Sequence, residues 1–337
     1  MEGALILRKK DYMKALKGLS LNRLSIIGIY IYIFAPTILF LLFWLKPVYA
    51  MIVGALTLFG MSESIAEEKP FWAPRWNRDN VIKVTVVFFL IILWVLYSGI
   101  GASVVQYTDH LYRNLMYRLL VDYDWPAYHM HGDSKRAFVY YFGYWLPAAL
   151  LAKLTHSYSF GFLFQQIWAV IGMFFVWYCV CEKQKKLRLW YLIVLVFFGG
   201  LDAVGRYLSM DFFTTVGNRF EWWSVAFNYP SFSVQLFWTF NQFIYSLVIF
   251  CLLERQKNNK GLVLIWSTAL ITCTITAVGM IPFVVYKAIQ NAKGEKKLIR
   301  FKNAVLSSIS IANIAGVIVS LVLTLFLLPN EAVVDNA

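Results

Sequence analysis

The chain has 337 residues, of which 60% are hydrophobic, 18% are aromatic and only 15% are charged. Soluble domains carry roughly 45–50% apolar and about 25% charged residues, so this composition excludes an ordinary soluble protein and indicates an integral membrane protein. The net charge of +13 does not indicate nucleic-acid binding. Most Lys and Arg residues lie in short clusters between apolar runs, where they set the orientation of membrane helices.

The apolar runs predict an all-α, polytopic membrane helix bundle, because a helix needs about 20 apolar residues to cross the hydrocarbon core. The runs that reach this length are residues 24–45, 81–105, 159–181, 234–253 and 304–328. Weaker segments cover residues 47–62, 189–205 and 262–289. The last is too long for one span and contains Gly279 and Pro282, so we expect two short helices that meet inside the membrane. In all, we expect about eight or nine inserted segments.

In chain order, the basic residues divide the protein into regions and place its N-terminus in the cytoplasm. Residues 1–23 are basic, and we expect them to lie on the inner membrane surface as an amphipathic helix that contacts anionic lipid. The further regions are two membrane helices (24–62), a cytoplasmic loop (63–80), the main membrane domain (81–328) and a short tail (329–337). The chain is therefore expected in a cell membrane as a multi-pass protein.

This topology requires that the stretch AFVYYFGYWLPAALLAKL, residues 137–154, does not cross the bilayer. If it crossed, the basic cluster at residues 182–188 would fall on the opposite side from the other clusters. Its Tyr and Trp residues, with Pro147 near its middle, favour a helix that lies at the outer interface. An ordinary span that violates the charge rule is the alternative.

The polar residues gather in two long extracytoplasmic loops, 106–158 and 206–233. The sequence has four His residues, and with this topology all of them lie on the outer side. The inner acids Glu63, Glu67 and Glu68 accompany basic residues, as on an ordinary solvated face. We expect the two aromatic loops to pack together and enclose a cavity, so a functional site is expected on the outer side.

The first loop begins with TDHLYRNLMYRLL, which predicts a helix starting near Thr108. The helical repeat places Leu111, Leu115 and Leu119 in one row, which we expect to pack against the core. Asp109 has two interpretations. In the first, Thr108 caps the helix, and Asp109 interacts favourably with the N-terminal end of the helix dipole and pairs with Arg113, which is a purely structural arrangement. Alternatively, the Asp109 carboxylate acts as a general base or a metal ligand.

A candidate divalent metal site follows in the segment HMHGD. His129, His131 and Asp133 alternate along the chain, so in an extended segment their side chains point the same way and could share an ion. The alternative is a polar turn. No cofactor other than this metal ion is indicated.

Further acids and aromatic residues lie near the second loop. Asp202 in FFGGLDAVG is at the end of an apolar run, where an acid usually faces a cavity or a partner such as Arg206. Glu221 is followed by Trp222 and Trp223. Carboxylates beside aromatic faces are typical of sugar-binding sites, although interfacial Trp anchors have the same composition.

These elements, in this order, resemble the GT-C superfamily of membrane glycosyltransferases. The chain has a membrane helix, an outer loop with Asp109 near its start, the aromatic stretch YYFGYWLPAALLAKL, and a helix that descends to a basic loop. The pieces FGGLDAVG, EWWSVAFNYPSFSVQLFW and TAVGMIPFVVY are also similar to uncharacterised bacterial polytopic proteins of this architecture. The resemblance covers roughly residues 81–328 and implies a bacterial cytoplasmic membrane.

The resemblance implies transfer of a sugar from a polyprenyl-phosphate-linked donor to an acceptor at the outer face. Asp109 would be the catalytic base. Arg113, Arg206 or Arg219 would hold the donor phosphate, since a planar guanidinium suits phosphate. The remaining substrate-binding candidates are His110, Asp202, Glu221, Trp222 and Trp223.

Two features depart from the family pattern. Many relatives have a second acid beside the first, where this chain has His110, and the tail after residue 328 is short. We therefore expect a shortened member, one half of a split pair that needs a partner subunit, or a relative that has lost activity. The alternative functions are a transporter or flippase of a lipid-linked or amphipathic substrate, and a non-enzymatic membrane subunit.

Overall fold

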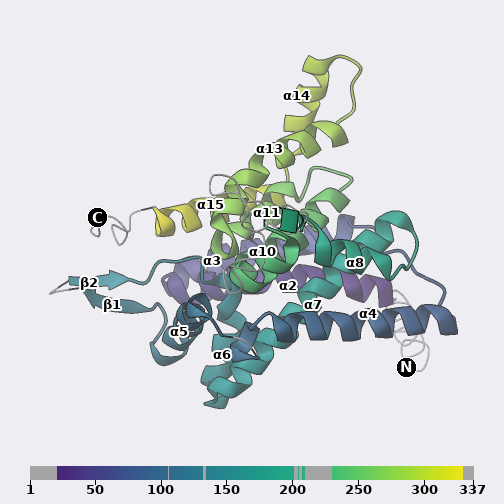
Figure 1. Ribbon diagram of the computed structural model, residues 1–337. Helices are drawn as coiled ribbons and strands as arrows, with labels where there is room; N and C mark the ends of the chain where they lie inside the picture. Colours follow the sequence, from purple (N-terminus) through teal and green to yellow (C-terminus); the bar gives the residue numbers. More distant parts are fainter. Residues whose placement is uncertain are drawn as a thin grey trace, which may run out of the picture.

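A computed structural model describes residues 21–104, 106–131, 134–200, 204, 207–208 and 230–328. Within these ranges the chain is mainly helical, so the expected all-α class is confirmed (Figure 1). The long helices are α2 (Leu21–Trp44), α3 (Pro47–Glu67), α4 (Arg78–Tyr97), α7 (Tyr158–Gln184), α10 (Phe232–Arg255), α13 (Thr274–Asn291) and α15 (Ile311–Leu327). The shorter elements are η1 (Ile100–Ala102), α5 (Thr108–Asp122), β1 (Tyr128–His131), β2 (Ser134–Ala137), η2 (Gly143–Trp145), α6 (Leu146–Thr155), α8 (Trp190–Phe197), α11 (Leu262–Ser267), α12 (Ala269–Thr272) and α14 (Lys297–Ser307).

Several helices could cross a membrane, which supports a membrane protein. Among the described residues, α2, α3, α4, α7 and α10 are long and apolar enough, and the bent pair α14–α15 adds a sixth span if it is counted as one. The expected number of eight or nine segments is not confirmed. The weak segment 47–62 extends to residue 67 as the full helix α3, whereas the described part of 189–205 contains the eight-residue helix α8.

The core of the bundle is built from aromatic side chains of helices that are distant in sequence. Tyr32 of α2 stacks on Trp168 of α7 at 4.5 Å and on Tyr245 of α10 at 5.1 Å between ring centroids. The Trp168 indole donates a hydrogen bond to the Tyr245 hydroxyl (2.9 Å), which in turn donates to the Tyr32 carbonyl (3.3 Å). The Trp168 indole N–H and the Tyr245 hydroxyl therefore have partners within the apolar interior, whereas the Tyr32 hydroxyl is buried without one.

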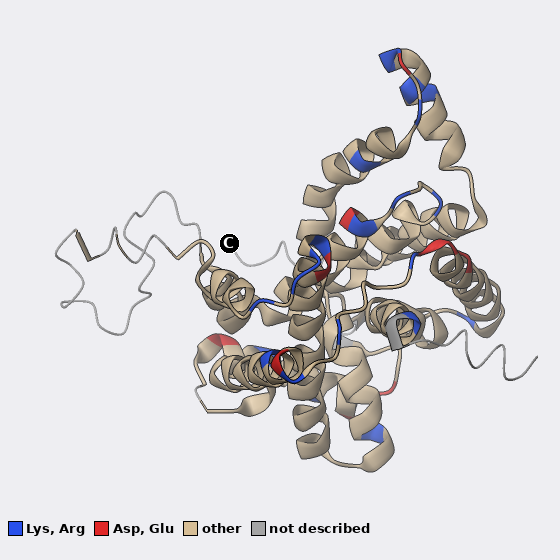
Figure 2. Ribbon diagram, turned by 90° about the vertical axis from the view of Figure 1, so that its right-hand side faces the viewer, with Lys and Arg blue, Asp and Glu red and all other residues tan. Residues whose placement is uncertain are grey.

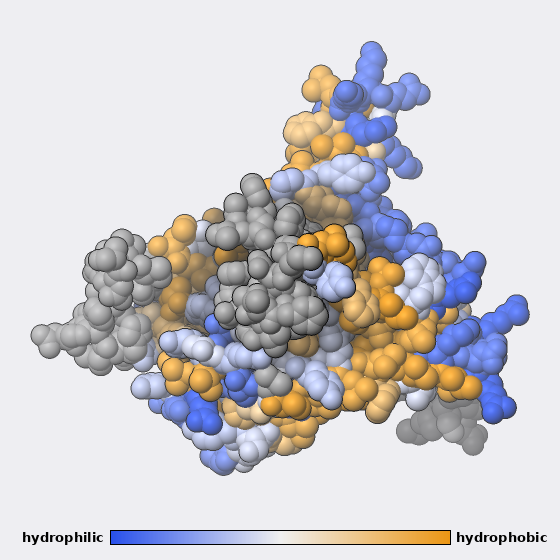
Figure 3. Space-filling model, viewed as in Figure 1, coloured by the Kyte–Doolittle hydropathy of each residue, from blue (hydrophilic) through white to orange (hydrophobic). Residues whose placement is uncertain are grey.

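Different elements form the two ends of the bundle. One end carries the turns 68–77, 185–189 and 256–261, and its surface is hydrophilic at the right of Figure 3. We call it the basic end. The opposite end carries α5, the β1–β2 hairpin and α6, and we call it the α5–α6 end. A hydrophobic band lies between the two (Figure 3).

Residues 262–291 form a helical hairpin that enters the bundle and turns back. The Trp266 indole donates to the Ala277 carbonyl at 2.8 Å, so α11 and α13 lie side by side. At its far end, Asn291 donates to the Asn258 carbonyl at 3.1 Å, so both ends of the hairpin lie at the basic end. Two helices do meet within the bundle, as expected. The break is at Cys273, however, because α13 continues through Gly279 and Pro282.

Three other expected boundaries were wrong. Helix α4 ends at Tyr97 instead of continuing to 105, because Gly99 and Gly101 adopt positive φ angles of 82° and 68°. The expected helix 137–154 is a ten-residue helix, α6, with Pro147 in its first turn; a helix of this length is too short to cross a membrane. The run 304–328 is divided between α14 and α15, which are bent by 80°.

Close backbone contact at Gly316 provides a test of this packing. A Cβ atom at Gly316 would lie 2.6 Å from the Leu264 Cα and 2.7 Å from the Val263 carbonyl carbon, whereas one at Gly279 would meet nothing within 4 Å. We predict that Gly316→Ala lowers the free energy of unfolding by about 1–3 kcal/mol, because α15 must move away from α11. Gly279→Ala is the control. It should leave the midpoint temperature of thermal unfolding in detergent unchanged or raise it slightly. Equal effects of both substitutions would contradict this packing.

Candidate functional site at the start of helix α5

Helix α5 turns a polar row of side chains towards the protein. Its buried residues are His110, Tyr117 and Leu120, whereas Leu111 is 62% and Leu115 57% exposed. The expectation that the leucine row packs against the core was therefore wrong. The helical spacing of that row was right, but the spacing alone does not tell which side of a helix faces protein and which faces lipid.

His110 fixes the rotation of α5. Its Nε2 lies 2.9 Å from the Ser98 carbonyl, and its Nδ1 accepts the Tyr107 backbone N–H at 3.3 Å. Because a carbonyl only accepts, Nε2 carries the proton and the ring is neutral. Burial lowers the pKa of His110, which favours this neutral form. The expected cap at Thr108 was wrong, since Tyr107 is the N-cap residue and His110 accepts its N–H.

The guanidinium of Arg113 lies one turn further along the same inward face. Its side chain is only 14% exposed, and its Nε and Nη1 atoms are buried without a hydrogen-bond partner. Its Cζ lies 5.7 Å from the centre of the Phe240 ring. Burial lowers the pKa of Arg113, but an arginine keeps its charge in proteins. Unused donors on a buried cation can bond to an anion.

Asp109 stands beside this cation and is open to solvent. Its side chain is 48% exposed, and its Oδ2 lies 4.0 Å from Arg113 Nη1. A charge-assisted hydrogen bond is about 2.7–2.9 Å long, so the two groups attract each other without forming one. The carboxylate therefore keeps its lone pairs available for a hydroxyl proton, and the guanidinium keeps its donors available for an anion.

Aromatic side chains from other elements surround Arg113, and the sequence did not single them out. Tyr140 and Tyr141 stack at 3.8 Å between ring centroids and lie close enough to interact electrostatically with Arg113. Burial raises the pKa of Tyr140. Trp238 of α10 packs against His110 at 5.9 Å. The only signal in the sequence was the aromatic density around residue 140, which was attributed to membrane anchoring.

The structure brings Asp109, His110 and Arg113 together on α5, but most other predicted site residues lie outside the described residues. These are Asp133, Asp202, Arg206, Arg219, Glu221, Trp222 and Trp223. His129 and His131 lie on strand β1, so their segment is extended, as the metal prediction requires. Among the described residues, no group of three His, Cys, Asp or Glu side chains could hold a metal ion. The divalent metal ion remains a prediction.

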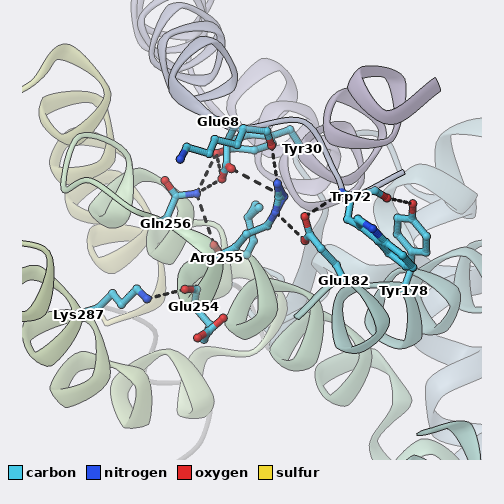
Figure 4. Close-up of polar contacts among 11 residues, drawn as sticks. Tyr30, Glu68, Trp72, Tyr178, Glu182, Glu254, Arg255, Gln256 and Lys287 are labelled. Atoms are coloured by element: carbon cyan, nitrogen blue, oxygen red, sulfur yellow. Dashed lines mark hydrogen bonds and ion pairs between the residues drawn. The ribbon is translucent and has the colours of Figure 1, made fainter. Parts of the chain in front are cut away.

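A second polar cluster lies at the basic end, around Arg255 (Figure 4). The Arg255 Nε donates to Glu182 Oε2 at 3.0 Å, and Arg255 Nη1 lies 3.9 Å from Glu68 Oε2. The guanidinium also lies 4.1 Å from the centre of the Phe71 ring and donates to the Lys69 carbonyl. All three charged side chains are at least 89% buried, since their exposed fractions are 5–11%. The sequence had suggested that Glu68 belongs to a solvated face. The structure buries it instead.

This cluster ties the loop after α3 to α7 and α10. Glu182 Oε1 accepts the Trp72 backbone N–H at 3.2 Å, and Gln256 donates to Glu68. Burial raises the pKa of Glu68, while Arg255 lowers it. Apart from Arg255 Nη1, which is buried without a hydrogen-bond partner, the groups bond to one another, which indicates a structural role. A cavity of about 680 Å³ nevertheless opens beside them, lined in part by Cys179, Lys183 and Lys257.

Comparisons with family models, with curated proteins and with solved structures find no match to this chain.

The Arg255 cluster yields a stability prediction. Arg255→Gln leaves two buried carboxylates without their cation and should cost about 3–5 kcal/mol of unfolding free energy at neutral pH. Because burial holds the pKa of Glu68 above its ordinary value, the folded protein takes up this proton first as the pH falls. The stability of the Arg255→Gln variant should therefore recover as the pH falls from neutral towards the ordinary pKa of a glutamate.

The measurement is denaturant unfolding in detergent at several pH values. The control is Lys183→Gln, which removes an exposed ion pair with Glu254 and should cost less than about 1 kcal/mol. A loss in Arg255→Gln that is no larger than in the control would contradict the structural role. So would a loss that acidification does not reduce.

Proposed function

We propose that this chain is a membrane glycosyltransferase of the GT-C type. It would transfer a sugar from a polyprenyl-phosphate-linked donor to an acceptor hydroxyl at the extracytoplasmic face of a bacterial cytoplasmic membrane. The observation that carries the proposal is the buried Arg113 guanidinium, whose Nε and Nη1 lack acceptors, one turn from the open Asp109 carboxylate. An anion site beside a free base is what this reaction requires.

The polarity of the two ends supports an outer location for this site. Basic loops prefer the cytoplasm, so the basic end would face inwards and the α5–α6 end outwards. Helix α5 would then lie at the outer interface with Leu111 and Leu115 towards lipid. Arg113, on the opposite face, would lie at the level of the headgroups. A phosphate attached to a membrane-embedded chain lies at that same level.

The order of elements supports the proposal as well. Between the long apolar helices α4 and α7 stand two short helices, α5 with Asp109 in its first turn and α6 after the aromatic stretch. The Tyr117 hydroxyl of α5 donates to the Tyr158 carbonyl at the start of α7, at 3.0 Å. This contact holds α5 rigidly against the bundle, and a rigid support keeps a catalytic side chain in position.

In the proposed reaction, Asp109 accepts the proton of the acceptor hydroxyl. The acceptor oxygen forms a bond to the anomeric carbon of the sugar, and the bond between that carbon and the phosphate oxygen breaks. The polyprenyl phosphate leaves with the electron pair. Arg113 stabilises the negative charge that develops on it, because its buried guanidinium has donors without a partner. His110 contacts neither the donor nor the acceptor. It positions Asp109 and Arg113 through the rotation of α5.

The base assignment predicts the effect of Asp109→Asn, which keeps the shape of the side chain but removes its basicity. Transfer should fall by about 10²–10⁴-fold, the usual contribution of a general base. The measurement is transfer from radiolabelled polyprenyl-phosphate hexoses and pentoses in membranes that contain the full chain. Asp79→Asn, at the exposed first turn of α4, is the matched control and should retain activity. Undiminished transfer in Asp109→Asn, at normal protein abundance, would exclude the assignment.

The phosphate assignment predicts a different pattern for Arg113→Lys. A lysine keeps the charge but loses the paired planar donors, so binding of the polyprenyl phosphate should weaken by roughly tenfold or more. Arg118→Lys, on the exposed side of the same helix, should not change it. Unchanged affinity of Arg113→Lys for polyprenyl phosphate in a detergent-based binding assay would contradict this role.

Transport of an amphipathic substrate is the second candidate function. It is favoured by the hairpin 262–291, which breaks at Cys273 within the bundle, since discontinuous helices often form transport sites. The cavity at the basic end also favours it. Proteoliposomes that contain a fluorescent lipid-linked sugar distinguish the two functions. Movement of the intact lipid between leaflets would support transport, whereas sugar transfer without such movement would support the enzyme.

A further inference from the structure

Helix α14 turns its apolar side chains away from the protein. Leu298 is 80% exposed, and Phe301 and Val305 are each 53% exposed. These positions fall on one helical face. On the opposite face, polar residues bond to the turn that precedes the helix. There Arg300 Nε donates to the Gly294 carbonyl at 3.2 Å, and Asn303 donates to the Lys293 carbonyl at 2.8 Å. This arrangement is the reverse of a helix that faces water.

The direction of α14 places it across the axis of the bundle. It is bent by 80° from α15, and α15 packs along α3 within the bundle. In Figure 1, α14 projects away from the body of the molecule at the top of the view. A bundle that crosses a membrane would therefore hold α14 nearly in the membrane plane. The neighbouring helix α13 also exposes apolar residues, including Ile275 and Val278.

Positive charges border the exposed apolar face. Lys293, Lys296, Lys297, Arg300 and Lys302 are all exposed, and Glu295 is the acid among them. None of these cations forms an ion pair with a carboxylate in the part of the chain that the structure describes. The projecting arm carries Lys and Arg at its far end (Figure 2), and its apolar and hydrophilic sides face opposite ways (Figure 3).

We propose that α14 and the turn 292–296 bind anionic phospholipids in the leaflet at the basic end. The apolar face would enter the acyl-chain region, and the lysines would contact the phosphate groups at its edge. Lysine side chains suit this position, because their long apolar stems reach along the helix while the ammonium groups stay among the headgroups. A protein partner that bound only the lysines, from the water side, would leave the apolar face uncovered. This proposal does not depend on glycosyl transfer.

The first experiment measures the lipid that remains bound to the purified full chain. The protein is mixed with equal amounts of phosphatidylglycerol and phosphatidylcholine in detergent, and bound lipid is counted by native mass spectrometry. The test variant combines Lys293→Gln, Lys296→Gln, Lys297→Gln and Lys302→Gln, which spares the Arg300 hydrogen bond. The matched control combines Arg75→Gln, Arg78→Gln, Lys186→Gln and Arg188→Gln, exposed cations elsewhere at the basic end.

The preference for phosphatidylglycerol should fall roughly tenfold or more in the test variant, because each lysine near an anionic surface contributes to the attraction. It should persist in the control variant and in a variant with the same four lysines changed to Arg. The proposal would be overturned by an unchanged preference in the test variant. An equal loss in the control would overturn it too, since the attraction would then belong to the whole basic end.

A second experiment tests the placement of the apolar face. A nitroxide label at Leu298→Cys, in full-length protein in lipid nanodiscs, should be more accessible to oxygen than to a water-soluble nickel chelate. A label at Arg300→Cys, on the opposite face, should show more access to the chelate. Chelate access at Leu298→Cys would overturn the proposal. Spin–spin broadening there would do the same, because a second copy of the chain would then cover the face.

Discussion

The candidate site depends on the two hydrogen bonds of one neutral imidazole. His110 joins the end of α4, through the Ser98 carbonyl, to the start of α5, through the Tyr107 N–H. Turning His110 inwards also turns Arg113 inwards, because residues three apart share a helical face. It turns Leu111 and Leu115 outwards for the same reason. The position that interrupted the family pattern is thus the one that orients the site.

The two buried arginines differ in how many partners surround them: Arg255 lacks a hydrogen-bond partner only at Nη1, whereas Arg113 lacks one at both Nε and Nη1. At the basic end, Arg255 has Glu182, Glu68, a backbone carbonyl and an aromatic ring around it. Arg113 has an aromatic ring and a carboxylate 4.0 Å away. Burying a charge costs free energy that partners normally repay. An arginine held in this way is stabilised when an anion binds, which couples ligand binding to the stability of the fold.

The sequence predicted the features that follow from hydropathy and missed those that follow from three-dimensional contact. The long apolar helices, the break near the middle of 262–289 and the non-crossing stretch before residue 155 were all visible as apolar length, aromatic density and charge. The buried state of Glu68 was not visible, because its cation lies on α10, 187 positions along the chain. Nor was the direction of the α5 leucines, since lipid and protein interior reward the same side chains. The break at Cys273 instead of Pro282 also depended on tertiary contact, with Trp266 bonded to the Ala277 carbonyl.

A structure of the full chain with a bound polyprenyl-phosphate sugar would show whether Arg113 holds a lipid-linked phosphate beside Asp109, as we propose. We expect a phosphate oxygen within hydrogen-bond distance of Arg113 Nε or Nη1, with the anomeric carbon facing Asp109. A phosphate bound elsewhere, with the Arg113 guanidinium paired to a carboxylate of the protein, would contradict it.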